Sequence, residues 1–308
     1  MMSPAGPTLI GIDVGEVFLD LAILNAAHGV LRLARVPVSG LELHRSVPED
    51  ADASERSVIS ELHWRLMAVA PELGIAGTIA LIDSPRWPRA LDLAKPTANT
   101  SRSGRSAGGR AIDRSLREIV AQLALKRPDG RSFRLSLFPT PGLEYFAVCA
   151  ADPLCKTHLA AIARELFGSA LHSPPRLPLP TGGRLFTRFM LAGFAVYRAL
   201  EPTGAECFEA YPDLAFRLWA EGVDLPPKNA GRAALDVRKR INQRLADELG
   251  CSGASRISTL DGADAAILAL SAAMAARVGS IAVIEHSREG RFALALNRAQ
   301  TCRLFPAR

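Results

Sequence analysis

The feature that most limits how this chain can fold is Asp13, an acidic residue inside an apolar run near the N-terminus. Its neighbours Leu9, Ile10, Ile12 and Val14 are typical of a buried strand. Burying a carboxylate costs on the order of several kcal/mol unless a cation or hydrogen-bond donors meet it. The rest of the fold must therefore bring compensating groups to Asp13.

Three consecutive strands are predicted at the start of the chain, because residues 8–15, 18–25 and 30–38 are each crowded with apolar residues or alternate them with polar ones. They predict a meander with its first strand at the centre. A helical pattern over residues 54–74 follows, and then a fourth apolar run that ends in Asp83.

From residue 86 to about residue 203 the pattern loosens into Gly/Ser/Arg-rich and Pro-rich segments separated by helical stretches. We interpret residues 86–203 as an insertion, or lid subdomain, within a single domain that spans residues 1–308. Regular structure is predicted again over a strand that ends near Tyr211, a helix over residues 231–249, a helix from about residue 259 and a C-terminal hairpin over residues 280–298.

The composition is that of a globular protein, with 48% hydrophobic and 22% charged residues. A net charge of +6 and a pI near 9.4 favour polyanionic partners. We see no leader peptide and no apolar stretch long enough for a membrane span, so we expect a cytoplasmic protein without a membrane partner. The five cysteines are scattered, which implies neither disulfides nor a zinc site.

Four carboxylates lie at the ends of predicted elements: Asp13, Asp83, Asp261 and Asp264. Because Asp261 and Asp264 are three residues apart, they share one helix face. Each acid has a simpler explanation, such as a helix cap for Asp261 or a turn acceptor for Asp83. Taken together they predict a shared site with oxygen ligands, which suits two Mg²⁺ or Mn²⁺ ions that could hydrolyse a phosphodiester.

The ordered set of "GIDVG", a three-stranded meander, "ALIDSP" and a late "DGADAAILALSAA" resembles the RNase H-like superfamily. The D-x-x-D helix is most similar to the RuvC-type Holliday-junction resolvases. With "RAIDRSLREI", "ECFEAYPDLAFRLW" and "PPKNAGRAALDVRKRI" added, the chain more closely resembles the family called domain of unknown function 429, which is described as predicted RNase H-like nucleases.

This resemblance implies an α/β fold of the RNase H-like type: a mixed five-stranded sheet flanked by helices, with a large insertion after the fourth strand. It makes Asp13 the metal ligand of the central strand, Asp83 the acid of the fourth strand, and Asp261 and Asp264 the helix acids. The resolvases carry Glu at the fourth-strand position, so the shorter Asp83 departs from their pattern. They also act as dimers, which leaves a homodimer possible here.

Further candidates flank this predicted site. Glu209 lies in the fifth strand and is either an additional catalytic acid or a structural acceptor. Lys228 and Arg232 are either phosphate contacts or a solvated helix start. Arg110, with Arg102 and Arg105 before it, lies where a loop could fold over a phosphate backbone.

The sequence therefore predicts a metal-dependent nuclease that binds DNA or RNA. A nucleic-acid-binding module with an inactive site is a second hypothesis. A phosphotransferase of the actin and hexokinase type is a third, although the chain has no second glycine-rich phosphate loop after an acidic strand.

Overall fold

The structure is a computed structural model that describes ten stretches of the chain: residues 7–15, 17–25, 29–38, 41, 51–87, 110–127, 129–135, 183–220, 222–287 and 289–306. For residues 51–58, 183–188 and 191 it describes the backbone alone. Arg102, Arg105 and residues 136–182 of the predicted insertion lie outside the described residues. No helix in the described stretches is long and apolar enough to cross a membrane.

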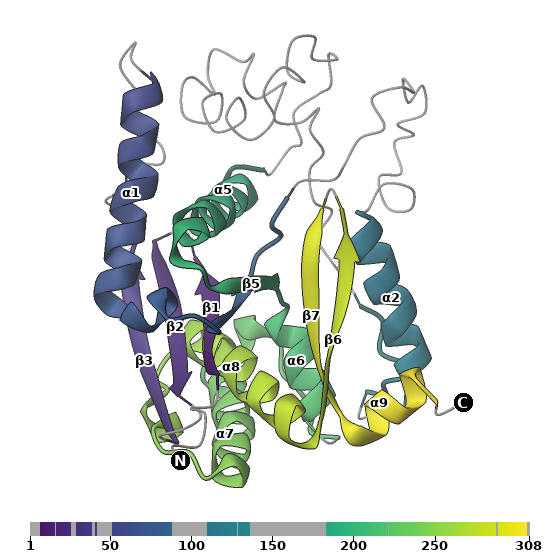
Figure 1. The fold of residues 1–308 in the computed structure, drawn as a ribbon. Coiled ribbons are helices and arrows are strands. Elements are labelled where there is room, and N and C mark those ends of the chain that lie inside the picture. The colour runs from purple at the N-terminus through teal and green to yellow at the C-terminus, as the bar shows by residue number, and fades with distance from the viewer. Residues whose placement is uncertain are drawn as a thin grey trace, which may run out of the picture.

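A single mixed sheet forms the centre of the described fold, with strand order β3-β2-β1-β4-β5-β7-β6 (Figure 1). Its strands are β1 (Thr8–Val14), β2 (Phe18–Asn25), β3 (Val30–Pro37), β4 (Ile79–Asp83), β5 (Glu206–Glu209), β6 (Gly279–His286) and β7 (Gly290–Asn297). The first three strands are antiparallel to one another, while β4 and β5 run parallel to β1. The first five strands thus have the predicted mixed arrangement.

The predicted number of five strands is wrong, because the sheet has seven. The C-terminal hairpin of β6 and β7 joins the same sheet, where Glu209 of β5 is paired with Phe292 of β7. Without β7, the backbone groups on that side of β5 would be an unpaired edge. The hairpin therefore closes the sheet next to the strand that carries Glu209.

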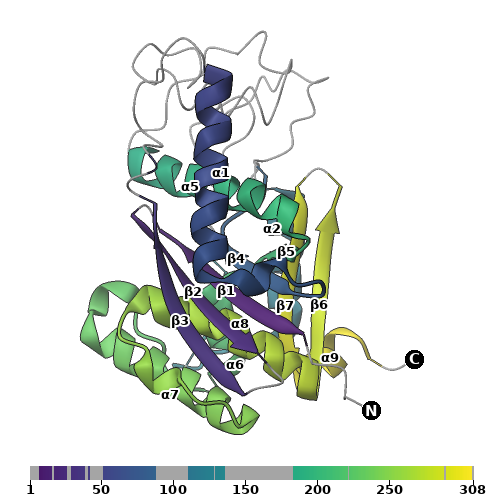
Figure 2. The same cartoon turned by 60° about the vertical axis from the view of Figure 1, so that its left-hand side comes forward.

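Helices cover both faces of the sheet (Figures 1 and 2). They are α1 (Ala51–Val69), α2 (Ala111–Leu123), α5 (Gly183–Leu200), α6 (Pro212–Trp219), α7 (Arg232–Leu249), α8 (Leu260–Val278) and α9 (Arg298–Leu304). Ile10 and Ile12 of β1 belong to the core under α1 and α5, while Leu9 belongs to the core with α6, α7 and α8. Because side chains alternate along a strand, Gly11 and Asp13 share the α8 side with Leu9.

Two helices of the predicted insertion pack in the main cores. Val196 and Leu200 of α5 are buried against the sheet beside α1, and Leu116 and Val120 of α2 are buried in the core on the α8 side. These parts of residues 86–203 therefore contribute to the main hydrophobic cores.

Helix α8 is buried over most of its length and crosses β1 at very short range. Thr259 caps its N-terminus by accepting a hydrogen bond from the backbone N–H of Gly262 at 3.0 Å. A methyl group added to Gly11 would lie 2.0 Å from the carbonyl oxygen of Ala265. Glycine at position 11 is therefore what allows the first turns of α8 to lie directly over β1.

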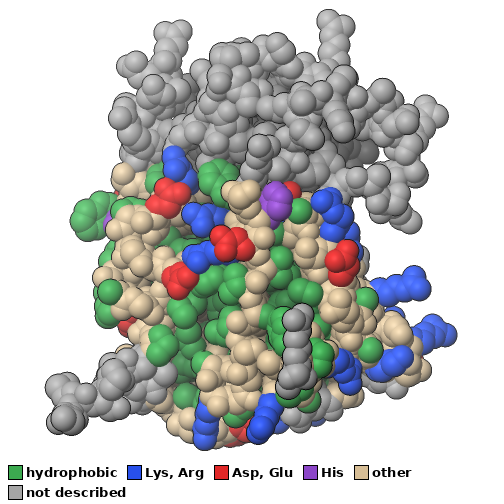
Figure 3. Space-filling model, turned by 45° about the vertical axis from the view of Figure 1, so that its right-hand side comes forward, with side chains coloured by type: hydrophobic (Ala, Val, Ile, Leu, Met, Phe, Trp, Pro, Cys, Tyr) green, Lys and Arg blue, Asp and Glu red, His purple; other side chains and the backbone are tan. Residues whose placement is uncertain are grey.

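Acidic and basic side chains are mixed on the face of the molecule that Figure 3 shows. The net charge of +6 therefore does not make this face uniformly basic.

We predict that Gly11→Ala destabilises the protein, because the new methyl group forces α8 away from β1. Overpacking of this kind costs roughly 1–3 kcal/mol. Gly74→Ala is the matched control, since its methyl group would meet only the flexible end of Met67, at 3.0 Å. Urea denaturation followed by circular dichroism measures both free energies of unfolding, and equal values for the two variants would contradict the prediction.

Candidate functional site

Two aspartates meet where β1 and β4 end. The two strands are parallel, and their register pairs Asp13 with Asp83 directly. Asp13 is buried, with 5% of its surface exposed, and its carboxyl group interacts electrostatically with that of Asp83. The sheet therefore holds two acids side by side, which is unfavourable unless they share a proton or a cation lies close by.

Helix α8 adds two further acids to this pair. Asp264 is fully enclosed, with 1% of its surface exposed, whereas Asp261 in the first turn is exposed. Both lie close enough to Asp13 to act on it electrostatically. Ala265 lies directly over Gly11. Asp264 precedes Ala265, and Asp13 points to the same face of the sheet as Gly11, so Asp264 lies near Asp13. We call Asp13, Asp83, Asp261 and Asp264 the acid cluster.

Lys228 brings a positive charge to the acid cluster. It begins the short 3-10 helix η6 (Lys228–Ala230), and its Nζ lies 2.5 Å from Oδ2 of Asp264. Burial alone would lower the pKa of this lysine, but Asp264, Asp13 and Asp83 together raise it above its usual value. About half of the Lys228 side chain is nevertheless exposed, so this cation stands between the acids and solvent.

Arg238 of α7 lies on the inner side of the acid cluster. It is 1% exposed, and its Nε is 3.4 Å from Oδ1 of Asp264, too poorly oriented for a hydrogen bond. Among the described residues, neither atom has a hydrogen-bond partner. An acceptor as strong as a carboxylate oxygen is seldom left in this state, so Oδ1 of Asp264 is available to a further cation or donor.

Burial and mutual repulsion raise the pKa values of the acids. Burial raises the pKa of Asp13 well above its usual value, and Asp83 adds to this effect while Lys228 opposes it. Burial also raises the pKa of Asp83 to about 7, against a smaller opposing effect of Lys228. The pKa of Asp264 is likewise raised by burial and lowered in part by Lys228. Lys228 and Arg238 thus compensate the cluster incompletely.

The donor set matches a hard divalent ion in its chemistry, since every member is a carboxylate oxygen. In the described stretches, no three His, Cys, Asp or Glu side chains are arranged closely enough to hold one ion. Lys228 occupies the contact to Asp264 that an ion would use. The residues therefore fit a divalent cation in chemical kind, and binding one requires that the carboxylates draw closer together and that the ammonium group of Lys228 move aside.

Glu209 belongs to a second charged cluster. Its two carboxylate oxygens accept hydrogen bonds from the guanidinium group of Arg110, one of them at 2.8 Å, and Arg110 also donates to Asp113 at 2.8 Å. All three side chains are 5% exposed or less. Burial alone would lower the pKa of Arg110, but Glu209 and Asp113 raise it. This cluster fastens the start of α2 to the end of β5.

Arg110 and Arg232, two predicted phosphate contacts, both lie away from the acid cluster or are already engaged by acids. The Arg110 guanidinium is enclosed and engaged, so the prediction that it contacts phosphate does not agree with this placement. Its charge is matched by acids inside the protein. Arg232 is also apart from the acid cluster: its side chain is 90% exposed and lies 3.8 Å from Asp236 one turn further along α7.

One acid next to the site, Asp20, was not among the predicted site residues. Asp20 of β2 is paired with Asp13 in the β1–β2 register, and Arg35 of β3 donates two hydrogen bonds to its Oδ1, at 2.8 and 3.1 Å. Burial raises the pKa of Asp20, whereas Arg35 lowers it and Asp261 adds a small rise. The short turn after Val14 fixes this register, so Asp20 could have been found from the predicted hairpin.

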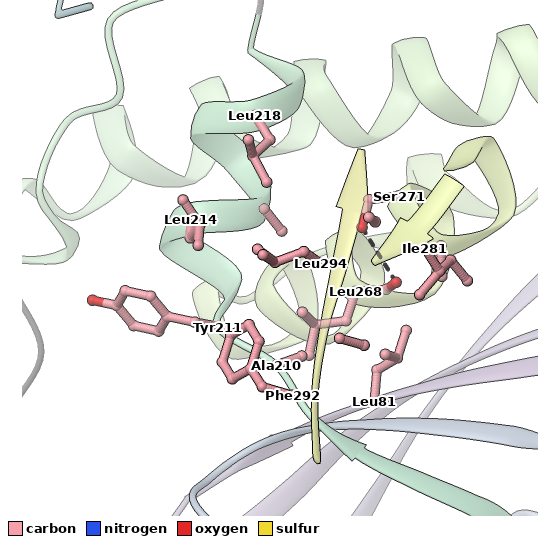
Figure 4. A pocket seen from close by; sticks show the side chains of 14 residues that line it. Leu81, Ala210, Tyr211, Leu214, Leu218, Leu268, Ser271, Ile281, Phe292 and Leu294 are labelled. Atoms are coloured by element: carbon pink, nitrogen blue, oxygen red, sulfur yellow. Dashed lines mark hydrogen bonds between the residues drawn. The ribbon is translucent and has the colours of Figure 1, made fainter. Parts of the chain in front are cut away.

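An apolar crevice near the site has no room for a ligand. It lies between α6, α8 and β7, where Leu214, Leu268 and Leu294 converge, and has a volume of about 20 Å³ (Figure 4). The ring of Tyr211 points away from it. Such a volume holds about one water molecule.

Comparison with known proteins adds a single structural similarity. No family model matches the chain, and no curated protein matches it. Among solved structures, T. thermophilus RuvC in complex with Holliday junction substrate is similar over 94% of this chain and 99% of that chain, at 12% sequence identity and a TM-score of 0.40. A similarity of this size does not bear on function.

We predict that the metal-free protein loses stability as the pH rises from about 4 to about 7. Folding raises the pKa of Asp83 from 3.8 to about 7, so the folded protein binds more protons than the unfolded chain in this range. The free energy of unfolding then falls with rising pH. Asp83→Asn should reduce this slope and be the more stable protein at the upper end.

The measurement is urea denaturation at a series of pH values in EDTA. Asp236→Asn, a change on the exposed side of α7, is the control and should keep the wild-type slope. An Asp83→Asn slope equal to the wild-type slope would mean that Asp83 does not carry the effect.

Proposed function

We propose that this protein is a divalent-metal-dependent hydrolase that cleaves phosphodiester bonds in nucleic acid, with an RNase H-like fold. One observation carries the proposal: Asp13, Asp83 and Asp264, from two parallel strands and a helix, are enclosed together with raised pKa values. Acids held in this way are not needed for stability, because their mutual repulsion opposes folding. A function that requires converging carboxylates accounts for them.

The acid cluster would hold Mg²⁺ or Mn²⁺ through Asp13, Asp83 and Asp264, with the exposed Asp261 as the outermost acid. When bound, such ions activate water and stabilise the oxygens of a phosphoryl group in transfer. The oxygens whose negative charge is not fully compensated are Oδ1 of Asp264 and the carboxylate oxygens of Asp13 and Asp83.

The protein's own residues have separate parts in this proposal. Asp13 and Asp83 are fixed on the sheet, so their carboxyl groups have little freedom to leave the site. Lys228 is half exposed, and its ammonium group can turn from Asp264 toward a phosphate oxygen of the substrate. Glu209, bound to Arg110, acts as a positioning residue that holds the end of β5 next to Asp83.

The choice of nucleic acid as the substrate class rests on charge and on the sequence resemblance. The net charge is +6, and Lys228 lies on the side of the acid cluster that is open to solvent. The resemblance of the ordered motifs to those of predicted RNase H-like nucleases, including the domain-of-unknown-function 429 family, favours a polynucleotide over a small phosphodiester.

The Lys228–Asp264 contact favours one alternative, a module that binds nucleic acid without cleaving it. In that alternative the lysine compensates the acids permanently, and no metal enters. The two functions make opposite predictions for metal binding, which the next two experiments measure.

We predict that Asp13→Asn abolishes metal binding and cleavage together. Replacing one carboxylate by an amide removes a negative ligand and leaves the packing in place, because the two side chains have nearly the same shape. We expect more than about a hundredfold loss of activity. Isothermal titration of Mn²⁺ measures binding, and gel analysis of labelled DNA and RNA forms, with metal and with EDTA, measures cleavage.

Asp236→Asn is the control for this experiment and should bind metal and cleave as the wild type does. If the wild type takes up no Mn²⁺ at millimolar concentrations and cleaves none of the substrates, the hydrolase proposal fails and the binding module is favoured.

We predict that Lys228→Met increases the affinity for Mn²⁺ while it lowers cleavage. The variant removes the ammonium group that competes for Asp264 and keeps the apolar stem of the side chain. Titration at constant ionic strength measures the affinity. Unchanged or weaker Mn²⁺ binding would show that Lys228 does not occupy the metal's place.

A further inference from the structure

We infer that a hollow beside the acid cluster binds one unpaired nucleotide of the substrate strand, with aromatic rings for the base and arginines for a phosphate. This inference rests on the proposed function, because it assigns part of the substrate to a place next to that site. The hollow has a volume of about 370 Å³ and is lined by Arg127, Ser132, Phe133, Arg134, Leu135, Tyr211, Asp213 and Arg217. Small-molecule sites have volumes of roughly 300–1,000 Å³.

One side of the hollow is a short hairpin, which we call the tongue: residues 125–127 and 129–135. Its two arms are joined by hydrogen bonds from Arg127 N to Arg131 O and from Phe133 N to Leu125 O, both 2.8 Å. At its tip Gly130 has a φ of 77°, a conformation that favours glycine. The tongue is therefore an ordered element that holds Phe133 and Arg134 in place.

The other side of the hollow is formed by the start of α6. Asp213 accepts a hydrogen bond from Nε of Arg217 at 2.9 Å, and the Arg217 guanidinium lies 4.5 Å from the centre of the Phe133 ring. The ion pair with Asp213 thus holds the Arg217 guanidinium against the ring of Phe133. This arrangement gives a flat, partly buried surface suited to stacking a base.

Two arginines of the hollow remain available for an anion. Arg134 has no hydrogen-bond or ion-pair partner in the described part of the chain, and it is exposed. Arg127 is 57% exposed at its side chain and only 4.0 Å from Asp129, a loose contact. Because Asp213, the acid that lines the hollow, is bound to Arg217, the lining has an uncompensated positive charge that fits a phosphate.

Tyr211 connects the hollow to the acid cluster. It lines the hollow, and burial raises the pKa of its phenol to about 12, with further contributions from Asp213 of the hollow and Asp83 of the acid cluster. The backbone N–H of Ala210 donates to the carbonyl oxygen of Ile82 at 2.9 Å, so Tyr211 follows directly after the end of β5, beside the end of β4 that carries Asp83. A nucleotide in the hollow would therefore lie next to the acid cluster.

The size and the aromatic lining favour an unpaired nucleotide. A base inside a duplex is stacked and paired, so its face is covered and it cannot reach a ring within a hollow unless it leaves the helix. A base of a single strand offers its face directly to Phe133 and Tyr211.

The test measures binding in EDTA, so that hydrolysis cannot interfere. Fluorescence anisotropy of a labelled oligothymidine and of a duplex of equal length compares wild type with Phe133→Leu, which keeps an apolar side chain without a ring, and with Arg134→Ala. Arg131→Ala is the matched control, because Arg131 is a tongue arginine whose side chain is 83% exposed and does not line the hollow.

We expect Phe133→Leu to weaken binding of the single strand by roughly 5- to 20-fold and to change duplex binding little. Arg134→Ala should weaken it several-fold and lower the slope of log K against log salt by about 0.7. Arg131→Ala should stay within about twofold of wild type. Circular dichroism of each variant checks that the fold is kept.

The inference is overturned if Phe133→Leu and Arg134→Ala bind the single strand no more weakly than Arg131→Ala, or if both weaken single strand and duplex equally. Adding thymidine monophosphate as competitor separates a site for a strand from a site for a free nucleotide, and full competition at micromolar concentration would overturn the strand assignment. If Asp13→Asn loses cleavage but the tongue variants bind the single strand as the wild type does, the role of the hollow is refuted and the hydrolase proposal stands. If the tongue variants weaken binding but the wild type cleaves no substrate with any metal, the hydrolase proposal is refuted and the role of the hollow stands.

Discussion

The fold depends on keeping Asp13 in an apolar strand without leaving its charge uncompensated. The register places Asp83 beside it, and α8 brings Asp264 to the same place. The mutual repulsion of the acids is therefore added to the cost of burying Asp13. Lys228 offsets that repulsion only in part, as the raised pKa values of all three buried acids show. Nothing in packing requires such an arrangement, since asparagine or an apolar residue would fill the same volume. A divalent cation at this place, as we propose, would account for the acids.

Gly11 determines how close the acids lie, because it sets the distance between the backbones of β1 and α8. The carbonyl oxygen of Ala265 lies where a side chain at position 11 would begin, so α8 approaches β1 as closely as two backbones can. The alanines of α8 keep that approach short along its buried length. Any larger residue at the crossing would lift Asp264 from the sheet and separate it from Asp13 and Asp83. Local packing and the geometry of the candidate site are thus the same constraint.

Much of this organisation could be predicted from the sequence, because it rests on local patterns. Apolar runs predicted the strands, and the spacing of Asp261 and Asp264 predicted a common helix face. The contacts that could not be predicted join distant positions. Arg110 meets Glu209 across 99 residues, and only the folded structure shows that its guanidinium is enclosed by acids. The addition of β6 and β7 to the sheet depends on one residue pair, Glu209 with Phe292, which no pattern in either segment indicates. The tongue was missed because its hairpin is too short to show strand periodicity.

The two charged clusters differ in a way that bears on function. Arg110 is 3% exposed and donates to both Glu209 and Asp113, so its charge is matched inside the protein and its removal would leave buried acids without a partner. Lys228 is half exposed and contacts Asp264 from the solvent side, while Oδ1 of the same carboxylate faces Nε of Arg238 at 3.4 Å without a hydrogen bond. The first cluster has the features of a permanent fastening between α2 and β5. The second has the features of a cation that can be exchanged, because the ammonium group can reach water without moving the backbone. A chain that needed only stability would have compensated both clusters in the first way, and this difference supports the proposal that Asp13, Asp83 and Asp264 carry the chemistry.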